Sequence, residues 1–125
     1  MTLSLETEAI AEVTVLYCKG RLATHEEAAA FSGKVAQLLE HTRQLVIELS
    51  EVETIESAAL GELIVVHMWA RASGCVIHLS AACHRVRRWF EAANLTSVLA
   101  VHPTFEEAVL CCQRSGAKKR AATAA

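Results

Sequence analysis

The stretch Val46-Ile47-Glu48-Leu49-Ser50, followed closely by residues 55–61, constrains the fold of this chain more than any other. Its first part is the short apolar run of a buried β-strand, and its second part has the pattern of a turn leading into a helix that opens at Ser57. A strand that runs directly into a helix is typical of α/β proteins with a parallel sheet. The segment therefore predicts a central strand followed by a helix that covers the sheet.

The same alternation of apolar runs and helical patterns continues along the chain. Strands are predicted over residues 3–9, 13–19, 45–49, 75–79 and 98–101, with Gly20 ending the second of them. Helices are predicted from the capping boxes that begin at Thr24 and Thr104, from Ser57 to about residue 73, and after Ser80, which is expected to cap a short helix that turns Val86, Trp89 and Phe90 inward. The order β-β-α-β-α-β-α-β-α predicts an α/β fold with a mixed, mainly parallel sheet of about five strands and about four helices.

Length and composition place the chain among folded single domains. It has 125 residues, 53% of them hydrophobic, and a formal net charge of -2. We expect one domain over residues 1–114 and a disordered C-terminal tail over 115–125.

The charge argues against direct nucleic-acid binding, and the apolar runs are too short for membrane insertion. The five cysteines are odd in number and resemble small buried apolar residues, which favours the cytoplasm.

Motifs for catalysis, cofactors and metals are missing from the sequence. It contains no phosphate-binding glycine loop, dinucleotide fingerprint, zinc-protease motif or nucleophile elbow. We expect no catalytic residue, no cofactor and no metal ligand, and we interpret His67 and His78 as structural histidines. Cys83, beside His84, is the best candidate for a reactive thiol, although adjacent helical residues do not face each other.

Ser57 is the first candidate for a regulatory site. The start of a helix has unpaired backbone N–H groups and the positive end of the helix dipole, and both stabilise an added phosphate. The alternative is that Ser57 only caps the helix, since serine is a preferred N-cap residue.

The Ser57 helix is apolar on more than one side. Leu60, Leu63, Ile64 and His67 form one stripe, and a second stripe contains Glu62, Val65, Val66 and Trp69. A helix on a sheet needs one apolar stripe, so the second stripe either contacts a partner or packs under a neighbouring helix.

The chain resembles the STAS domain, the fold of bacterial anti-sigma factor antagonists. The similarity runs from Leu3 to Cys112 and includes Gly20-Arg21-Leu22, the stretch from Leu45 to Ser50, Ser73-Gly74, and Val86-Arg87-Arg88-Trp89-Phe90. The family signature at the switch is similar to D-S-(S/T/A)-G-L-G, and the residues here are Glu56, Ser57, Ala58, Ala59, Leu60 and Gly61. The chain thus has glutamate and alanine where the family has aspartate and its first glycine.

The resemblance implies an antagonist that binds an anti-sigma factor with serine kinase activity and thereby releases a sigma factor. The resemblance also implies that phosphorylation of Ser57 abolishes this binding and that a phosphatase restores it. The implied partner surface consists of Arg21, Thr24, Glu56, Ser57, Ala58, Ala59, Gly61, Glu62, Val65, Val66 and Trp69. The alternative is a constitutive binding subunit of a lipid-transport ATPase or of a signalling assembly. A homodimer is compatible with both functions.

Overall fold

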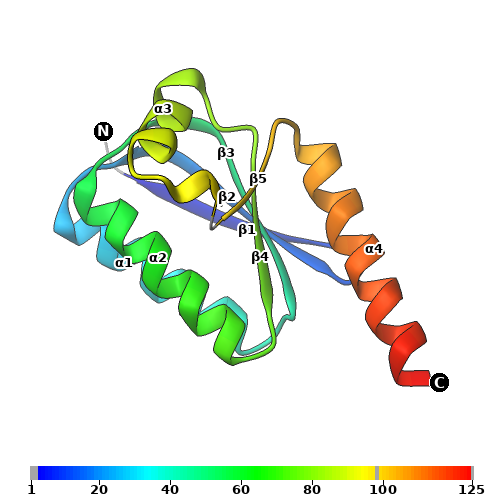
Figure 1. Ribbon diagram of the computed structural model, residues 1–125. Coiled ribbons are helices and arrows are strands. Elements are labelled where there is room, and N and C mark those ends of the chain that lie inside the picture. Colours follow the sequence, from blue (N-terminus) through cyan, green and yellow to red (C-terminus); the bar gives the residue numbers. More distant parts are fainter. Residues whose placement is uncertain (1–2, 98, 125) are drawn as a thin grey trace.

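The computed structural model of the protein describes residues 3–97 and 99–124, apart from the side chains of Ser97 and residues 115–124 (Figure 1). Its elements follow one another as β1 (Ser4–Ile10), β2 (Val13–Leu22), α1 (His25–Leu39), β3 (Gln44–Ile55), α2 (Ser57–Ala72), β4 (Val76–Ser80), α3 (His84–Ala92), the 3-10 turn η1 (Leu95–Ser97), β5 (Ala100–His102) and α4 (Phe105–Ala124). The predicted order of strands and helices is confirmed.

The strands form one sheet in the order β1-β2-β3-β4-β5. Strand β1 is antiparallel to β2, whereas β2, β3, β4 and β5 pair in parallel. The predicted mixed, mainly parallel sheet is therefore confirmed. Because the parallel strands share one direction, the chain leaves β2, β3 and β4 at the same edge of the sheet.

Helices cover both faces of the sheet. Helices α1, α2 and α3 lie on one side and α4 lies on the other (Figure 1). Strand β3 alternates between the two cores: Ile47 and Leu49 belong to the larger core under α1, α2 and α3, and Val46 belongs to the smaller core under α4. This alternation explains why the strand is apolar at nearly every position, as its sequence indicated.

Two strands extend beyond their predicted ends. Strand β3 continues to Ile55, and β2 continues past Gly20 to Leu22, which pairs with Ile55. Gly20 has φ 104°, a region that favours glycine, and the β2–β3 register shifts directly after it. The prediction that Gly20 ends the strand was therefore wrong, because its backbone accommodates an irregularity within a strand that continues to pair.

The helix starts are only partly as predicted. Thr24 forms the complete capping box with Glu27, whereas at α4 only the bond from the Glu107 backbone N–H to Thr104 Oγ1 (3.2 Å) is present in the part of the chain that the structure describes. The prediction that Ser80 caps the following helix was wrong. Ser80 is the last residue of β4, and the N-cap residue of α3 is Cys83.

The inward-facing side of α3 is narrower than predicted. Val86 and Phe90, one turn apart, are fully buried, but Trp89 is 40% exposed. The prediction that Trp89 faces the core was wrong. This nine-residue helix packs against β3 and buries Val86 and Phe90 in the larger core, and the neighbouring position of Trp89 lies at the rim of the helix.

Helix α4 continues to Ala124 along the backbone of the segment that was predicted to be a disordered tail. Alanine, lysine and arginine, which are frequent there, are strong helix formers. The division of the chain at residue 114 stays a prediction.

The last strand begins at Ala100, and Val98, the predicted start, lies outside the described residues. Among the helices described, none has the length and apolarity needed to cross a membrane.

One buried carboxylate lies on the sheet face that α4 covers. Glu48 is 7% exposed and accepts hydrogen bonds from the Ser80 hydroxyl (2.9 Å) and from the Ser50 backbone N–H (2.7 Å). Both Glu48 and Ser80 come from strands in the middle of the sheet. Their bond joins two adjacent strands in a poorly hydrated position, where it is stronger than at the surface.

We expect Ser80→Ala to lower the free energy of unfolding by about 1–3 kcal/mol, because it removes a donor from a buried carboxylate. Urea denaturation of the wild type and the variant measures the change. Ser50→Ala is the matched control, since Ser50 bonds Glu48 through its backbone N–H, which the substitution keeps. An equal effect of the two substitutions would contradict the importance of the Ser80 hydroxyl.

Candidate functional site

Ser57 is the first residue of α2 and is exposed. The N-cap residue is Glu56, whose backbone is extended, and the Glu56 side chain makes no capping hydrogen bond. The Ser57 hydroxyl has no hydrogen-bond partner among the described residues. The alternative in which Ser57 only caps its helix is therefore excluded, and its hydroxyl is free to react or to contact a partner.

The start of α2 is held against the neighbouring strand. The Glu56 backbone N–H donates to the Leu22 carbonyl (2.9 Å), and the Leu60 backbone N–H donates to the Glu56 carbonyl (3.0 Å). The first bond joins the start of α2 to the end of β2, and the second closes the first turn of the helix. Ser57 thus lies on a rigid helix start at the sheet edge where the parallel strands end, which is the usual place for functional residues in α/β sheets.

A charged depression lies at the same edge. It is lined by Arg21 from β2, Glu53 and Thr54 from β3, Glu56, and Arg85 from α3. Two arginines therefore accompany two of the glutamates that precede Ser57 in sequence. Glu51, a third, forms an ion pair with Lys19 (3.2 Å). The acidic character that the sequence shows before Ser57 is thus partly balanced by cations from other elements.

The exposed face of α2 is apolar beyond Ser57. Ser57, Gly61, Ile64 and Met68 are spaced by four, three and four residues, so they lie on one face of the helix. All are exposed, with Ile64 at 39% and Met68 at 63%. We call this set the serine face. Exposed apolar side chains that line up with a free hydroxyl are typical of an interaction surface.

The predicted partner stripe on α2 was partly wrong. Val66 is 1% exposed and belongs to the larger core, and Ala59 is fully buried there as well. Neither side chain is free to contact a partner. Ile64, by contrast, is exposed although it was grouped with Leu60 and Leu63, which are buried. Helix periodicity gives the spacing of the stripes, but packing on the sheet decides which stripe faces inward.

The other predicted contact residues remain accessible to different degrees. Trp69 is 45% exposed, and Ala58, Glu62 and Val65 are half-buried. Thr24 is exposed, and its hydroxyl accepts the Glu27 backbone N–H (3.1 Å) as the cap of α1. We therefore assign Thr24 a capping role in α1. A role of these residues in partner binding stays a prediction.

The candidate thiol Cys83 donates to the Val52 carbonyl (3.6 Å). Within the part of the chain that the structure describes, Cys83 has no hydrogen bond to an imidazole or a carboxylate. Burial raises the pKa of Cys18 and Cys112 to about 12, which keeps both thiols protonated. Among the described residues, Cys83 thus lacks a hydrogen-bonded base, and the thiols of Cys18 and Cys112 lack the low pKa that favours a nucleophilic thiolate.

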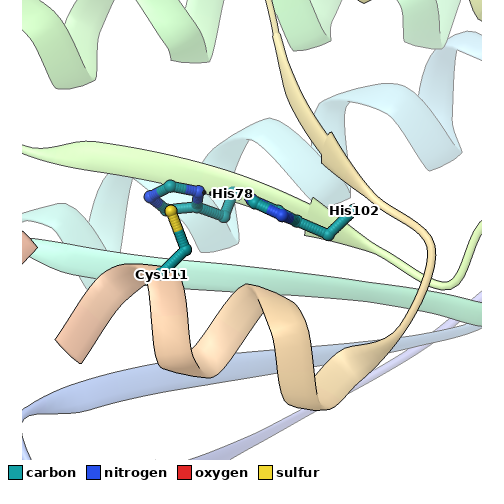
Figure 2. A group of neighbouring side chains, drawn as sticks. All are labelled: His78, His102 and Cys111. Atoms are coloured by element: carbon teal, nitrogen blue, oxygen red, sulfur yellow. Dashed lines mark hydrogen bonds between the residues drawn. The ribbon is translucent and has the colours of Figure 1, made fainter. Parts of the chain in front are cut away.

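A second group of polar side chains, which the sequence analysis missed, lies under α4. His78 on β4, His102 on β5 and Cys111 on α4 point toward one another (Figure 2). The distance from His78 Nδ1 to His102 Nε2 is 2.9 Å, that of a hydrogen bond. His78 is 4% exposed, and its Nε2 atom has no partner among the described residues. His78 is thus hydrogen-bonded through one ring nitrogen, and its interpretation as a structural histidine stays a prediction.

Sequence spacing gives little indication of this group. His78 and His102 are 24 residues apart, and Cys111 lies on a helix that follows. The only signal is the position of His78 inside an otherwise apolar strand. Burial lowers the pKa of His78 from 6.5 to about 4, with a further contribution from His102, so this imidazole is neutral at physiological pH.

Comparison with known proteins gives a family match. The family model described as "Mlab, STAS domain" matches residues 7–101. No curated protein matches the chain.

Several solved structures share the fold. The chain is similar to an anti-sigma factor antagonist from Mycobacterium paratuberculosis, with 20% identity, a TM-score of 0.81, and 90% of this chain and 95% of that one covered. It is also similar to a protein of Thermotoga maritima proposed to be such an antagonist, with 23% identity, a TM-score of 0.80, and coverage of 87% and 94%. For the phosphorylated form of SpoIIAA, a Bacillus cell fate determinant, the values are 16% identity, a TM-score of 0.65, and coverage of 85% and 96%.

The low pKa of His78 predicts that acid destabilises the fold. In the unfolded chain His78 binds a proton near pH 6.5, whereas in the folded chain it does so only near pH 4. The stabilising contribution is therefore complete above about pH 6.5 and is lost as the pH falls toward 4. We expect a loss of roughly 1–3 kcal/mol in the free energy of unfolding over this range.

Urea denaturation at a series of pH values measures this loss, and His78→Gln should flatten the dependence. His41→Gln, which changes an exposed histidine, is the matched control and should behave as the wild type. If His78→Gln and the wild type lose stability in parallel, His78 is not the group responsible.

Proposed function

Because the chain belongs to the STAS domain family, we propose that it is an anti-sigma factor antagonist that is switched by phosphorylation of Ser57. In this proposal it is a non-catalytic cytoplasmic protein. It binds an anti-sigma factor that is also a serine kinase, and binding releases a sigma factor. A phosphatase reverses the modification. Structural similarity to antagonists supports the proposal, including similarity to the phosphorylated form of SpoIIAA.

The observation that carries the proposal is the position of the free Ser57 hydroxyl at the head of an exposed apolar helix face. Ile64 and Met68 follow Ser57 along the serine face. A partner that covers this face removes water from the serine. A phosphate on Ser57 adds a charge of about -1.5 to -2, which must then be desolvated or repelled at the contact. One modification therefore weakens an interface that is otherwise apolar.

The same phosphate is compatible with the fold. At the first position of α2 it lies near the unpaired backbone N–H groups and the positive end of the helix dipole. Arg21 and Arg85 line the depression next to Glu56 and offset the nearby carboxylates. Phosphorylation is thus expected to change partner binding without unfolding the protein, which is what a reversible switch requires.

A second function remains open because of the family description. The matching family model names Mlab, and the exposed side chains of Ile64, Met68 and Trp69 do not depend on the state of Ser57. A constitutive binding subunit of a lipid-transport ATPase or a signalling assembly would use this apolar surface without a switch. The two functions differ in whether a charge at Ser57 changes binding.

Phosphopeptide analysis of the protein isolated from its own cells is the first test of the switch. We expect a phosphate on Ser57 that is missing from Ser57→Ala, and a kinase partner that transfers phosphate from ATP to the purified wild type. Binding to that kinase should weaken at least about tenfold in Ser57→Asp and persist in Ser57→Ala. If both variants bind as the wild type does, the switch is wrong and the constitutive subunit is favoured.

The serine face provides a second test. We expect Met68→Glu and Ile64→Glu to reduce kinase binding by at least about tenfold, because each places a charge in the apolar contact. Leu110→Glu is the matched control, since Leu110 is 49% exposed but lies on α4, across the sheet. Isothermal titration measures the affinities. Unchanged binding in both α2 variants would exclude the serine face as the contact surface.

A further inference from the structure

Three side chains with metal-binding atoms converge where α4 crosses the edge of the sheet. His78 and His102 come from adjacent parallel strands, and Cys111 comes from the helix above them (Figure 2). Each offers one ligand atom, and these atoms all lie within 4.8 Å of one another. This group is separate from Ser57, since α4 and α2 lie on opposite sides of the sheet (Figure 1).

The group also contains an incomplete hydrogen-bond network. His78 is nine-tenths or more buried, and its Nδ1 atom contacts His102 Nε2 at 2.9 Å. Its other ring nitrogen, Nε2, is buried with no partner in the described part of the chain. Buried polar atoms are almost always paired with protein atoms, with water or with an ion. The unpaired nitrogen beside a thiol and a second imidazole is therefore a position that a water molecule or a bound ion would complete.

We propose that His78, His102 and Cys111 form a binding site for Zn²⁺ or a closely similar divalent cation. Imidazole nitrogen and thiolate sulfur are the protein ligands that Zn²⁺ prefers, and two histidines with one cysteine provide three positions of a tetrahedral site. A water molecule or a group from outside the chain completes the fourth position. Cys111 and His102 are half-buried, which leaves the site accessible from solvent.

Binding of the ion at this site releases a proton from the protein. The Cys111 thiol loses its proton to solvent when its sulfur becomes a ligand. A proton on a ring nitrogen that binds the ion moves to the other nitrogen of the same ring, so neither imidazole loses a proton overall.

The ion would join α4 to the two strands beneath it. Without a metal, α4 contacts the sheet mainly through Ala108, Val109 and Cys112, in the smaller of the two cores. Three ligands from β4, β5 and α4 would add a direct connection across this layer. The bound form should therefore resist unfolding more strongly than the metal-free form, since the unfolded chain lacks the preformed site.

Titration of the metal-free, reduced full-length protein with Co²⁺ tests the site directly. Tetrahedral Co²⁺ bound to a thiolate has intense visible bands and a sulfur-to-metal charge-transfer band that hydrated Co²⁺ lacks. We expect these bands to saturate at one ion per chain and to disappear when Zn²⁺ is added. Zn²⁺ should also raise the midpoint of thermal unfolding of the wild type.

Cys111→Ser should abolish the charge-transfer band, and His102→Asn should abolish saturable binding. Cys83→Ser is the matched control, because Cys83 is also half-buried but lies outside the group, and it should bind as the wild type does. Circular dichroism shows whether each variant keeps the fold. A spectrum of hydrated Co²⁺ throughout the titration, or equal binding by Cys111→Ser and wild type, would overturn the proposal.

Discussion

The parallel pairing of β2 with β3 is the constraint on which the rest of the structure depends. Strand β3 is buried on both faces, so helices must cover both sides of the sheet. Pairing continues to Leu22 and Ile55, and the Glu56 backbone N–H then bonds the Leu22 carbonyl. The last bonds of this strand pair therefore set the position at which α2 begins.

The location of the candidate switch follows from this geometry. Parallel strands end at one edge, so the ends of β2 and β3 and the start of α3 bring Arg21, Glu56 and Arg85 to one depression. Ser57 follows Glu56 as the first helical residue, with its hydroxyl exposed. The sheet thus provides a rigid base, and the first turn of α2 provides a reactive group next to charges of both signs. The proposed modification of Ser57 would lie at the surface, outside both cores.

The opposite face of the sheet has a different character. Here the strands contribute polar side chains to a mostly apolar layer, namely the bonded pair of Glu48 and Ser80 and the histidines at 78 and 102. Buried polar groups are tolerated where they are paired, and Glu48 meets that condition. Within the described part of the chain, His78 meets it at one ring nitrogen only. This difference separates a structural hydrogen bond from a candidate ligand site within the same layer.

The sequence by itself determined the order of the elements, the mainly parallel sheet and the first position of the key helix. Hydrophobic periodicity and capping residues are local signals, and they identified Ser57 and the box at Thr24 without any knowledge of neighbours. The tertiary structure decided which side of α2 faces the sheet, so Val66 is buried and Ile64 is exposed. It also decided the meeting of His78, His102 and Cys111, because their contact depends on strand pairing and helix packing between residues far apart in the chain.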